Sequence, residues 1–184
     1  MTRGKRFPIS DSHRGTWSEL FAALALLSWY GACDHSGGIY MKQPNVVFII
    51  SDDQGFWSLG CAGNREIYTP NIDRLAAQGM RFENFFCVSP VCSPARASLL
   101  TGCIPSQHGV HDWLRDDDER RASIEYLAGQ YSYTKALAES GYECALSGKW
   151  HMGASARAQQ GFTHWFCHKS GGGPYYGAPL YRDG

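Results

Sequence analysis

The hydrophobic and polar positions first form a clear pattern at residues 45–50. This run is apolar and β-branched after its first residue, and it stops abruptly at Ser51, Asp52 and Asp53. A continuous apolar run of this length is typical of a strand buried on both faces of a parallel sheet. We therefore predict such a strand, with the two carboxylates at its carboxyl end.

Helical segments follow, marked by a proline in the first turn or a glycine after the last one. By these signs we predict helices over residues 70–78, 92–102 and 132–140. Strands are expected over residues 80–86 and 142–147, whereas the Gly-, Pro- and aromatic-rich part from residue 161 onward is expected to be loop. Strands that alternate with helices indicate right-handed crossovers and a parallel sheet, so the predicted class is α/β.

Composition narrows the classes of function. The 184 residues are 43% hydrophobic, enough for one globular core. Seventeen basic and seventeen acidic side chains cancel, which argues against a nucleic-acid partner. The seven cysteines contain no C-x-x-C pair, so zinc-ribbon and thioredoxin signatures are missing. His108 and His111 could suggest zinc together with Cys87 or Cys103, but a second compact ligand pair is lacking.

The first forty residues allow two interpretations. Basic residues precede a short apolar run, residues 20–27, that ends near Cys33, as in a signal peptide. Alternatively Met41 is the true start, because a strand follows it almost directly. The first interpretation predicts a periplasmic or secreted protein and the second a cytoplasmic one. The run is too short to span a bilayer. We expect residues 1–40 to be a signal-like or disordered leader and residues 41–184 to belong to one domain.

Chemically active side chains gather at the predicted ends of elements. Asp52 and Asp53 follow the first strand, Lys149 and His151 follow the strand over 142–147, and Cys92 begins a helix. Open α/β sheets bind ligands outside the carboxyl ends of their strands. Together with Arg96, these residues would supply carboxylates for a hard cation, two permanent positive charges, an imidazole and a sulfur nucleophile, which suits hydrolysis of an anionic ester.

A family resemblance rests on four motifs in order. Residues 92–96 read C-S-P-A-R and are followed by S-L-L-T-G at 98–102; the strand with its Asp pair, T-P-N-I-D-R-L at 69–75 and G-K-W-H at 148–151 accompany them. This pattern resembles the formylglycine-dependent type I sulfatases over about residues 44–165. The resemblance implies a three-layer α/β/α sandwich of the alkaline-phosphatase-like type with a mainly parallel sheet.

The resemblance also implies roles for single residues. Cys92 would be oxidised to formylglycine by a formylglycine-generating enzyme, and its hydrate would attack sulfur and later release sulfate. Asp52, Asp53 and the modified Cys92 would bind Ca²⁺, with Mg²⁺ as the alternative. Arg96 would hold the formylglycine oxygens, Lys149 would bind sulfate oxygens, and His151 would take a proton. His108 is a further substrate-binding candidate.

The expected activity is therefore hydrolysis of a sulfate monoester, either an aryl or a carbohydrate sulfate. Further metal ligands, a second lysine and a leaving-group histidine of such enzymes have no matching positions, so we expect a chain truncated at its C-terminus. Two alternatives stay open: a phosphonate monoester or phosphodiester hydrolase of the same superfamily, and a non-catalytic fragment.

Overall fold

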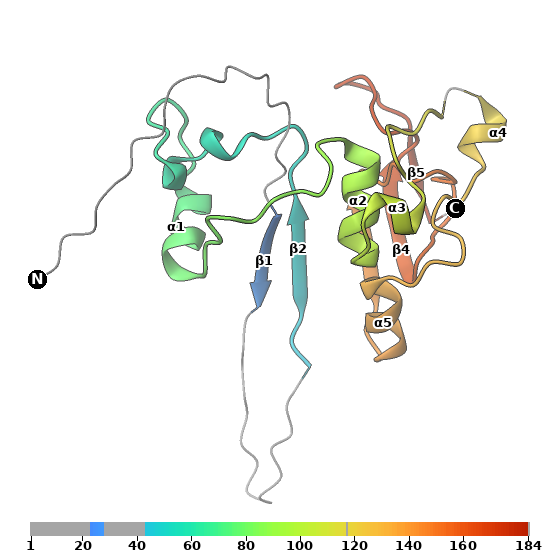
Figure 1. Cartoon of the computed structure of the whole chain (residues 1–184), viewed down its shortest axis with the longest axis horizontal. Helices are drawn as coiled ribbons and strands as arrows, with labels where there is room; N and C mark the ends of the chain where they lie inside the picture. Colours follow the sequence, from blue (N-terminus) through green and yellow to red (C-terminus); the bar gives the residue numbers. More distant parts are fainter. Residues whose placement is uncertain (1–22, 28–42, 117, 184) are drawn as a thin grey trace, which may run out of the picture.

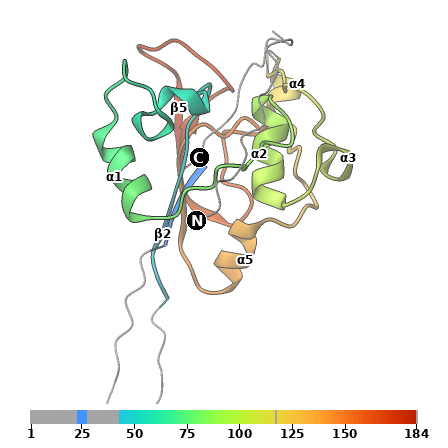
Figure 2. The ribbon, with the colours of Figure 1, turned by 60° about the vertical axis from the view of Figure 1, so that its left-hand side comes forward.

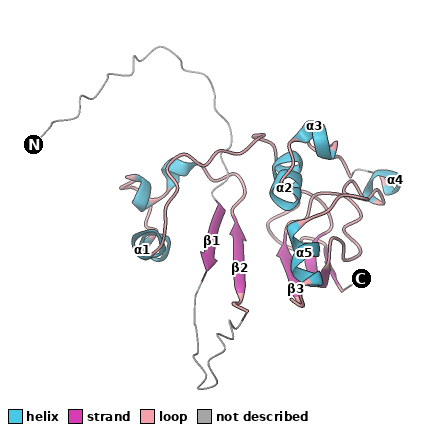
Figure 3. Cartoon of the chain, turned by 60° about the horizontal axis from the view of Figure 1, so that its bottom comes forward, coloured by secondary structure: helices cyan, strands magenta, loops and turns pink. Residues whose placement is uncertain are grey.

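The computed structural model describes residues 23–27, 43–116 and 118–183, and within them it has two separate sheets (Figure 1). The strands β1 (Ala23–Leu27) and β2 (Val46–Ile50) form an antiparallel pair. The second sheet has the order β3-β4-β5, with β3 (Cys144–Gly148) parallel to β4 (Phe162–His168) and β5 (Leu180–Arg182) antiparallel to β4. Figure 3 shows the pair β1–β2 standing apart from β3.

Short helices connect the strands, and their bounds follow the local sequence. They are η1 (Phe56–Ser58), η2 (Gly60–Ala62), α1 (Pro70–Gln78), α2 (Cys92–Thr101), α3 (Pro105–His108), α4 (Glu119–Ala122) and α5 (Tyr133–Glu139). α2 ends at Gly102, whose φ of 69° is left-handed and favours glycine. α5 begins because the Ser132 side chain accepts a hydrogen bond from the Lys135 backbone N–H. The predicted helices and the α/β class are thus confirmed.

The hydrophobic core lies between α2 and the β3–β4 sheet. It consists of Ala97, Leu100, Val110, Leu127, Trp150, Met152, Trp165 and Cys167. The Trp150 and Trp165 rings meet edge to face with centroids 5.1 Å apart. Their indole N–H groups donate to the carbonyls of Gly153 and Ser155, so neither buried nitrogen lacks a partner. This packing fixes α2 against the segment that directly follows β3.

β2 differs from the prediction of a strand buried on both faces of a parallel sheet. Val46, Val47 and Ile49 are 43%, 58% and 54% exposed. The reason is that β1 is its sole strand partner among the described residues, and that pairing is antiparallel. The rings of Phe48 and of Tyr133 in α5 meet edge to face with centroids 6.0 Å apart, and both line a hollow of about 500 Å³. α1 lies on the other side of β2 from α2 (Figure 2).

Two local predictions were wrong. Residues 80–86 form no strand, since Met80, Phe82, Phe85 and Phe86 are exposed and find no neighbouring ladder in the described part of the chain. The part from residue 161 onward contains β4 and β5, because Trp165 and Cys167 alternate into the core and anchor a strand.

Most of the predicted leader, residues 1–40, lies outside the described residues, so its interpretation stays a prediction. Within it, the structure describes Ala23–Leu27 as β1. No helix in the described part of the chain is both long and apolar enough to cross a membrane.

Candidate active site

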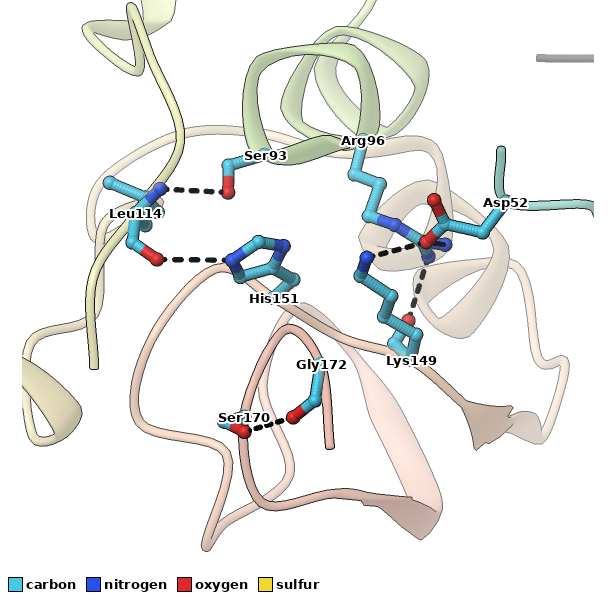
Figure 4. Close-up of polar contacts among 8 residues, drawn as sticks. All are labelled: Asp52, Ser93, Arg96, Leu114, Lys149, His151, Ser170 and Gly172. Atoms are coloured by element: carbon cyan, nitrogen blue, oxygen red, sulfur yellow. Dashed lines mark hydrogen bonds and ion pairs between the residues drawn. The ribbon is translucent and has the colours of Figure 1, made fainter. Parts of the chain in front are cut away.

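Three segments distant in sequence meet at the carboxylate of Asp52 (Figure 4). Asp52 follows β2, Arg96 lies one turn into α2, and Lys149 follows β3. The Oδ2 atom of Asp52 is 3.1 Å from Arg96 Nη2 and 2.5 Å from Lys149 Nζ. Arg96 Nη1 also donates to the Lys149 carbonyl at 2.8 Å, which ties α2 to the chain after β3. The structure therefore brings together three of the residues predicted for the site.

The environment of this cluster favours charge. Arg96 is 7% exposed and Asp52 is half-buried. Burial acts to raise the pKa of Asp52, but the hydrogen bond and charge of Lys149, and then those of Arg96, outweigh burial and hold that pKa below its ordinary 3.8. Because two cations face one carboxylate, the cluster has an excess positive charge, which suits an anionic ligand.

One oxygen of Asp52 meets the chemical requirement of a cation ligand. Oδ1 is buried and has no hydrogen-bond partner among the described residues. An orphaned carboxylate oxygen is a ligand that Ca²⁺ and Mg²⁺ accept. Asp53 next to it is exposed and has a left-handed φ of 55°. The described residues contain no group of three or more His, Cys, Asp or Glu side chains arranged around a metal position. The oxygens of Asp52 and Asp53 are of the kind that fits part of a calcium shell.

His151 lies buried beside this cluster, with a left-handed φ of 58°. Its Nε2 atom is 3.0 Å from the carbonyl oxygen of Leu114, and its ring meets the Trp113 ring edge to face at 5.5 Å. Burial lowers the pKa of His151 below 6.5, and the Leu114 hydrogen bond opposes that shift in part. A neutral imidazole at neutral pH is the form that can take up a proton.

We expect the free energy of unfolding to fall as the pH drops below 6.5, because His108 and His151 both have a lowered pKa in the fold. The unfolded chain then binds more protons, so each histidine's contribution is complete above 6.5 and is lost towards its folded pKa. The slope is at most about 1.4 kcal/mol per pH unit for each proton. Urea titrations at several pH values measure it. The double variant His108→Asn, His151→Asn should flatten the dependence, and an unchanged dependence would contradict this assignment.

Cys92 is the first residue of α2 and a half-buried free thiol. Arg96 follows four residues later, one helical turn away on the same face. Next to Cys92, the fully buried Ser93 hydroxyl accepts a hydrogen bond from the Leu114 backbone N–H at 3.2 Å. The N-terminus of α2 is thus hydrogen-bonded to Leu114, the residue whose carbonyl oxygen contacts His151.

The structure places His108 elsewhere. It is 3% exposed, its Nδ1 atom accepts a hydrogen bond from the Val110 N–H, and its Nε2 atom is 2.9 Å from the Ser98 hydroxyl. Since Nδ1 accepts, Nε2 carries the proton and donates to Ser98. These contacts join α3 to α2. None of the described contacts of His108 reaches Asp52, Arg96, Lys149 or His151.

Sequence reasoning missed three contributors to the site: Ser93, Leu114 and Gly171. Gly171 is buried, and a Cβ atom there would lie 2.0 Å from His151 Nε2, so a glycine is required at this close approach. The run of three glycines from Gly171 was the one available signal. Leu114 acts through its backbone, which leaves no mark in a side-chain pattern.

The comparisons with known proteins agree with one another. A family model described as Sulfatase matches residues 44–184. Human steryl-sulfatase is 36% identical over 141 residues, 76% of this chain and 24% of that protein. N-acetylgalactosamine-6-sulfatase of Canis lupus familiaris is 36% identical over 158 residues, 77% of this chain and 30% of that protein. N-acetylglucosamine-6-O-sulfatase of Bacteroides thetaiotaomicron is 34% identical over 171 residues, 91% of this chain and 28% of that protein.

A crystal structure from Bacteroides fragilis, described there as a candidate sulfatase, overlaps with a TM-score of 0.45 and 22% identity, covering 68% of this chain and 34% of that one. The chain spans less than a third of the length of the three curated relatives, 24% to 30%.

Proposed function

The chain belongs to the sulfatase family, and we propose that the protein containing it hydrolyses a sulfate monoester at the site of Cys92, Arg96 and Lys149. The observation that carries the proposal is the convergence of Arg96 and Lys149. Although 53 residues apart, both reach the same oxygen of Asp52, one turn along α2 from Cys92. Two fixed cations beside a nucleophile position are what the hydrolysis of an anionic ester requires.

The nucleophile would come from modification of the cysteine. When Cys92 is oxidised to formylglycine, the hydrated aldehyde supplies a hydroxyl that attacks sulfur and a way to release sulfate afterwards. Arg96, locked by Asp52 and the Lys149 carbonyl, would hold the oxygens at position 92 in place. Lys149 would neutralise the charge that develops on sulfate. His151, neutral at pH 7, would accept on its Nδ1 atom a proton from a hydroxyl of the hydrated formylglycine.

A divalent cation would complete the site. Asp52, through its orphaned Oδ1, Asp53 and the formylglycine at position 92 are the described residues that would hold Ca²⁺, or Mg²⁺ instead. The ion would supply positive charge that acidifies a bound hydroxyl. The remaining ligands are not among the described residues.

The substrate is proposed to be an aryl or carbohydrate sulfate. The relatives in question carry names of steryl and amino-sugar sulfatases, which span both classes. A phosphonate monoester or phosphodiester is the second candidate, because Arg96 and Lys149 recognise the charge of a tetrahedral anion rather than the central atom. The ratio of kcat/KM for matched aryl sulfate and aryl phosphodiester substrates decides between them. A non-catalytic fragment would turn over neither.

The experiment that tests the proposal is peptide mass spectrometry after co-expression with a formylglycine-generating enzyme. Trypsin releases residues 82–96, which contain both Cys87 and Cys92. We expect a loss of about 18 Da that fragmentation places at Cys92, the exchange of a thiol side chain for an aldehyde.

Cys87→Ser is the matched control variant, since it changes the other cysteine of the same peptide and should leave the mass loss in place. An unmodified Cys92, in cells that convert a known sulfatase, would overturn the proposal.

A further inference from the structure

We propose that Ser93 is a positioning residue for His151, acting through the peptide groups of Leu114. The Ser93 hydroxyl holds the Leu114 N–H, and the Leu114 carbonyl in turn fixes which ring nitrogen of His151 carries the proton (Figure 4). The catalytic meaning of this arrangement rests on the proposed function, in which His151 takes up a proton.

The Ser93 hydroxyl is buried and is hydrogen-bonded to the Leu114 backbone. Ser93 is 0% exposed, and its Oγ atom accepts from Leu114 N at 3.2 Å. A serine near a helix start ordinarily caps that helix, but the N-cap of α2 is Val91 and has no side-chain cap bond. The hydroxyl is therefore used for a contact 21 residues away. Leu114 lies in a segment without helix or strand, so side-chain contacts of this kind orient its peptides.

The contact with Leu114 determines the tautomer of His151. A carbonyl oxygen only accepts, so the 3.0 Å contact with Leu114 requires the proton on Nε2. In the neutral ring Nδ1 is then a bare acceptor. That atom is buried, has no partner among the described residues, and lies on the side of the ring that faces Arg96 in Figure 4. The atom left free is thus the one directed towards the cation cluster.

Neighbouring residues hold the His151 ring in one orientation. Gly171 packs against the Nε2 edge so closely that a Cβ atom would lie 2.0 Å away, and Trp113 covers the ring at 5.5 Å. The ring cannot turn over without displacing these neighbours. The charged groups that act on it are Lys149, Arg96 and Asp116. Because packing restrains the ring, the Leu114 carbonyl decides between the two tautomers.

The test is histidine NMR on the full 184-residue chain with ¹⁵N-labelled imidazoles at pH 8. Long-range ¹H–¹⁵N correlations distinguish the two neutral tautomers of a ring. The unaltered chain should show His151 in the Nε2–H form. In Ser93→Ala the Leu114 peptide loses its anchor, and we expect the ratio of Nδ1–H to Nε2–H to rise by about fivefold, the effect of one hydrogen bond. Ser93→Thr keeps the hydroxyl and should restore the original ratio.

Ser98→Ala is the matched control, because it removes a hydroxyl from the same helix that contacts the other buried histidine, His108. It should alter the His108 signals and leave those of His151 unchanged. If Ser93→Ala unfolds the chain, Ser93→Cys, which keeps the size with a weaker acceptor, takes its place with a smaller shift of the same direction.

The proposal is overturned if the His151 tautomer is the same in Ser93→Ala, or in the Cys variant, as in the unaltered chain. The measurement uses neither substrate nor formylglycine. An inactive enzyme would therefore count against the proposed function only, and an unmoved tautomer against the role of Ser93 only.

Discussion

Replacing Cys92 with alanine in the whole protein should lower kcat/KM for an aryl sulfate by about 10⁶-fold, the order observed when a covalent nucleophile is removed. Alanine can neither be oxidised to an aldehyde nor present a hydroxyl, whereas Arg96 and Lys149 would still bind the anion. KM should therefore change much less than kcat. Initial rates with a chromogenic aryl sulfate measure both constants.

Three further variants serve as controls for this result. Cys61→Ser, Cys87→Ser and Cys103→Ser remove other cysteines outside the core and should keep activity within a few-fold. If Cys92→Ala retained a hundredth of the original activity, the covalent route would be wrong. The site would then act through its cations alone.

Replacing Arg96 with alanine should lower the free energy of unfolding by about 3–5 kcal/mol, the cost of breaking a buried ion pair from one side. The Arg96 side chain is 9% exposed and bonds both Asp52 Oδ2 and the Lys149 carbonyl. Its loss leaves a half-buried carboxylate with one cation fewer and opens a gap between α2 and the chain after β3. Urea unfolding followed by circular dichroism measures the change.

The matched control is Arg157→Ala, which removes an arginine from the ion pair with Glu125, where the side chain is 64% exposed. Surface pairs contribute about 0–1 kcal/mol, so this variant should be nearly neutral. The double variant Arg96→Met, Asp52→Asn removes both charges of the Arg96–Asp52 pair and should recover part of the stability. A loss below about 1 kcal/mol in Arg96→Ala would mean that the cluster is hydrated and contributes little.

The helices could be predicted because their ends are local events. Pro70, Gly102 and Ser132 decide the ends of α1, α2 and α5 through backbone angles or one short-range hydrogen bond, and sequence displays these directly. The meeting of Asp52, Arg96 and Lys149 was predicted for a related reason. All three lie at the end or start of an element, and we expected such ends to share one edge of an α/β sheet. The three residues do meet, although β2 and β3 belong to separate sheets in the structure.

Strand partners and backbone contacts could not be predicted in this way. An apolar run such as Val46–Ile50 fits any partner that covers it, and its pairing with β1 depends on residues that sequence analysis had assigned to a leader. β4 was not predicted because its apolar and polar residues do not alternate cleanly: Trp165 and Cys167 point into the core, but the residue between them, Phe166, is also apolar. The role of Leu114 depends on its backbone N–H and carbonyl groups, which almost every residue possesses.

The exposed apolar side chains of β2 have a practical consequence for anyone preparing the chain. Val46, Val47 and Ile49 are exposed in a two-stranded sheet whose outer edges carry no further strand within the described residues. Exposed apolar edges are templates for pairing between molecules and for fibril-like aggregates. This ladder is therefore a site at which copies of the chain can associate, and replacing Val47, the most exposed of the three, with lysine should oppose that association by placing a charge on the strand.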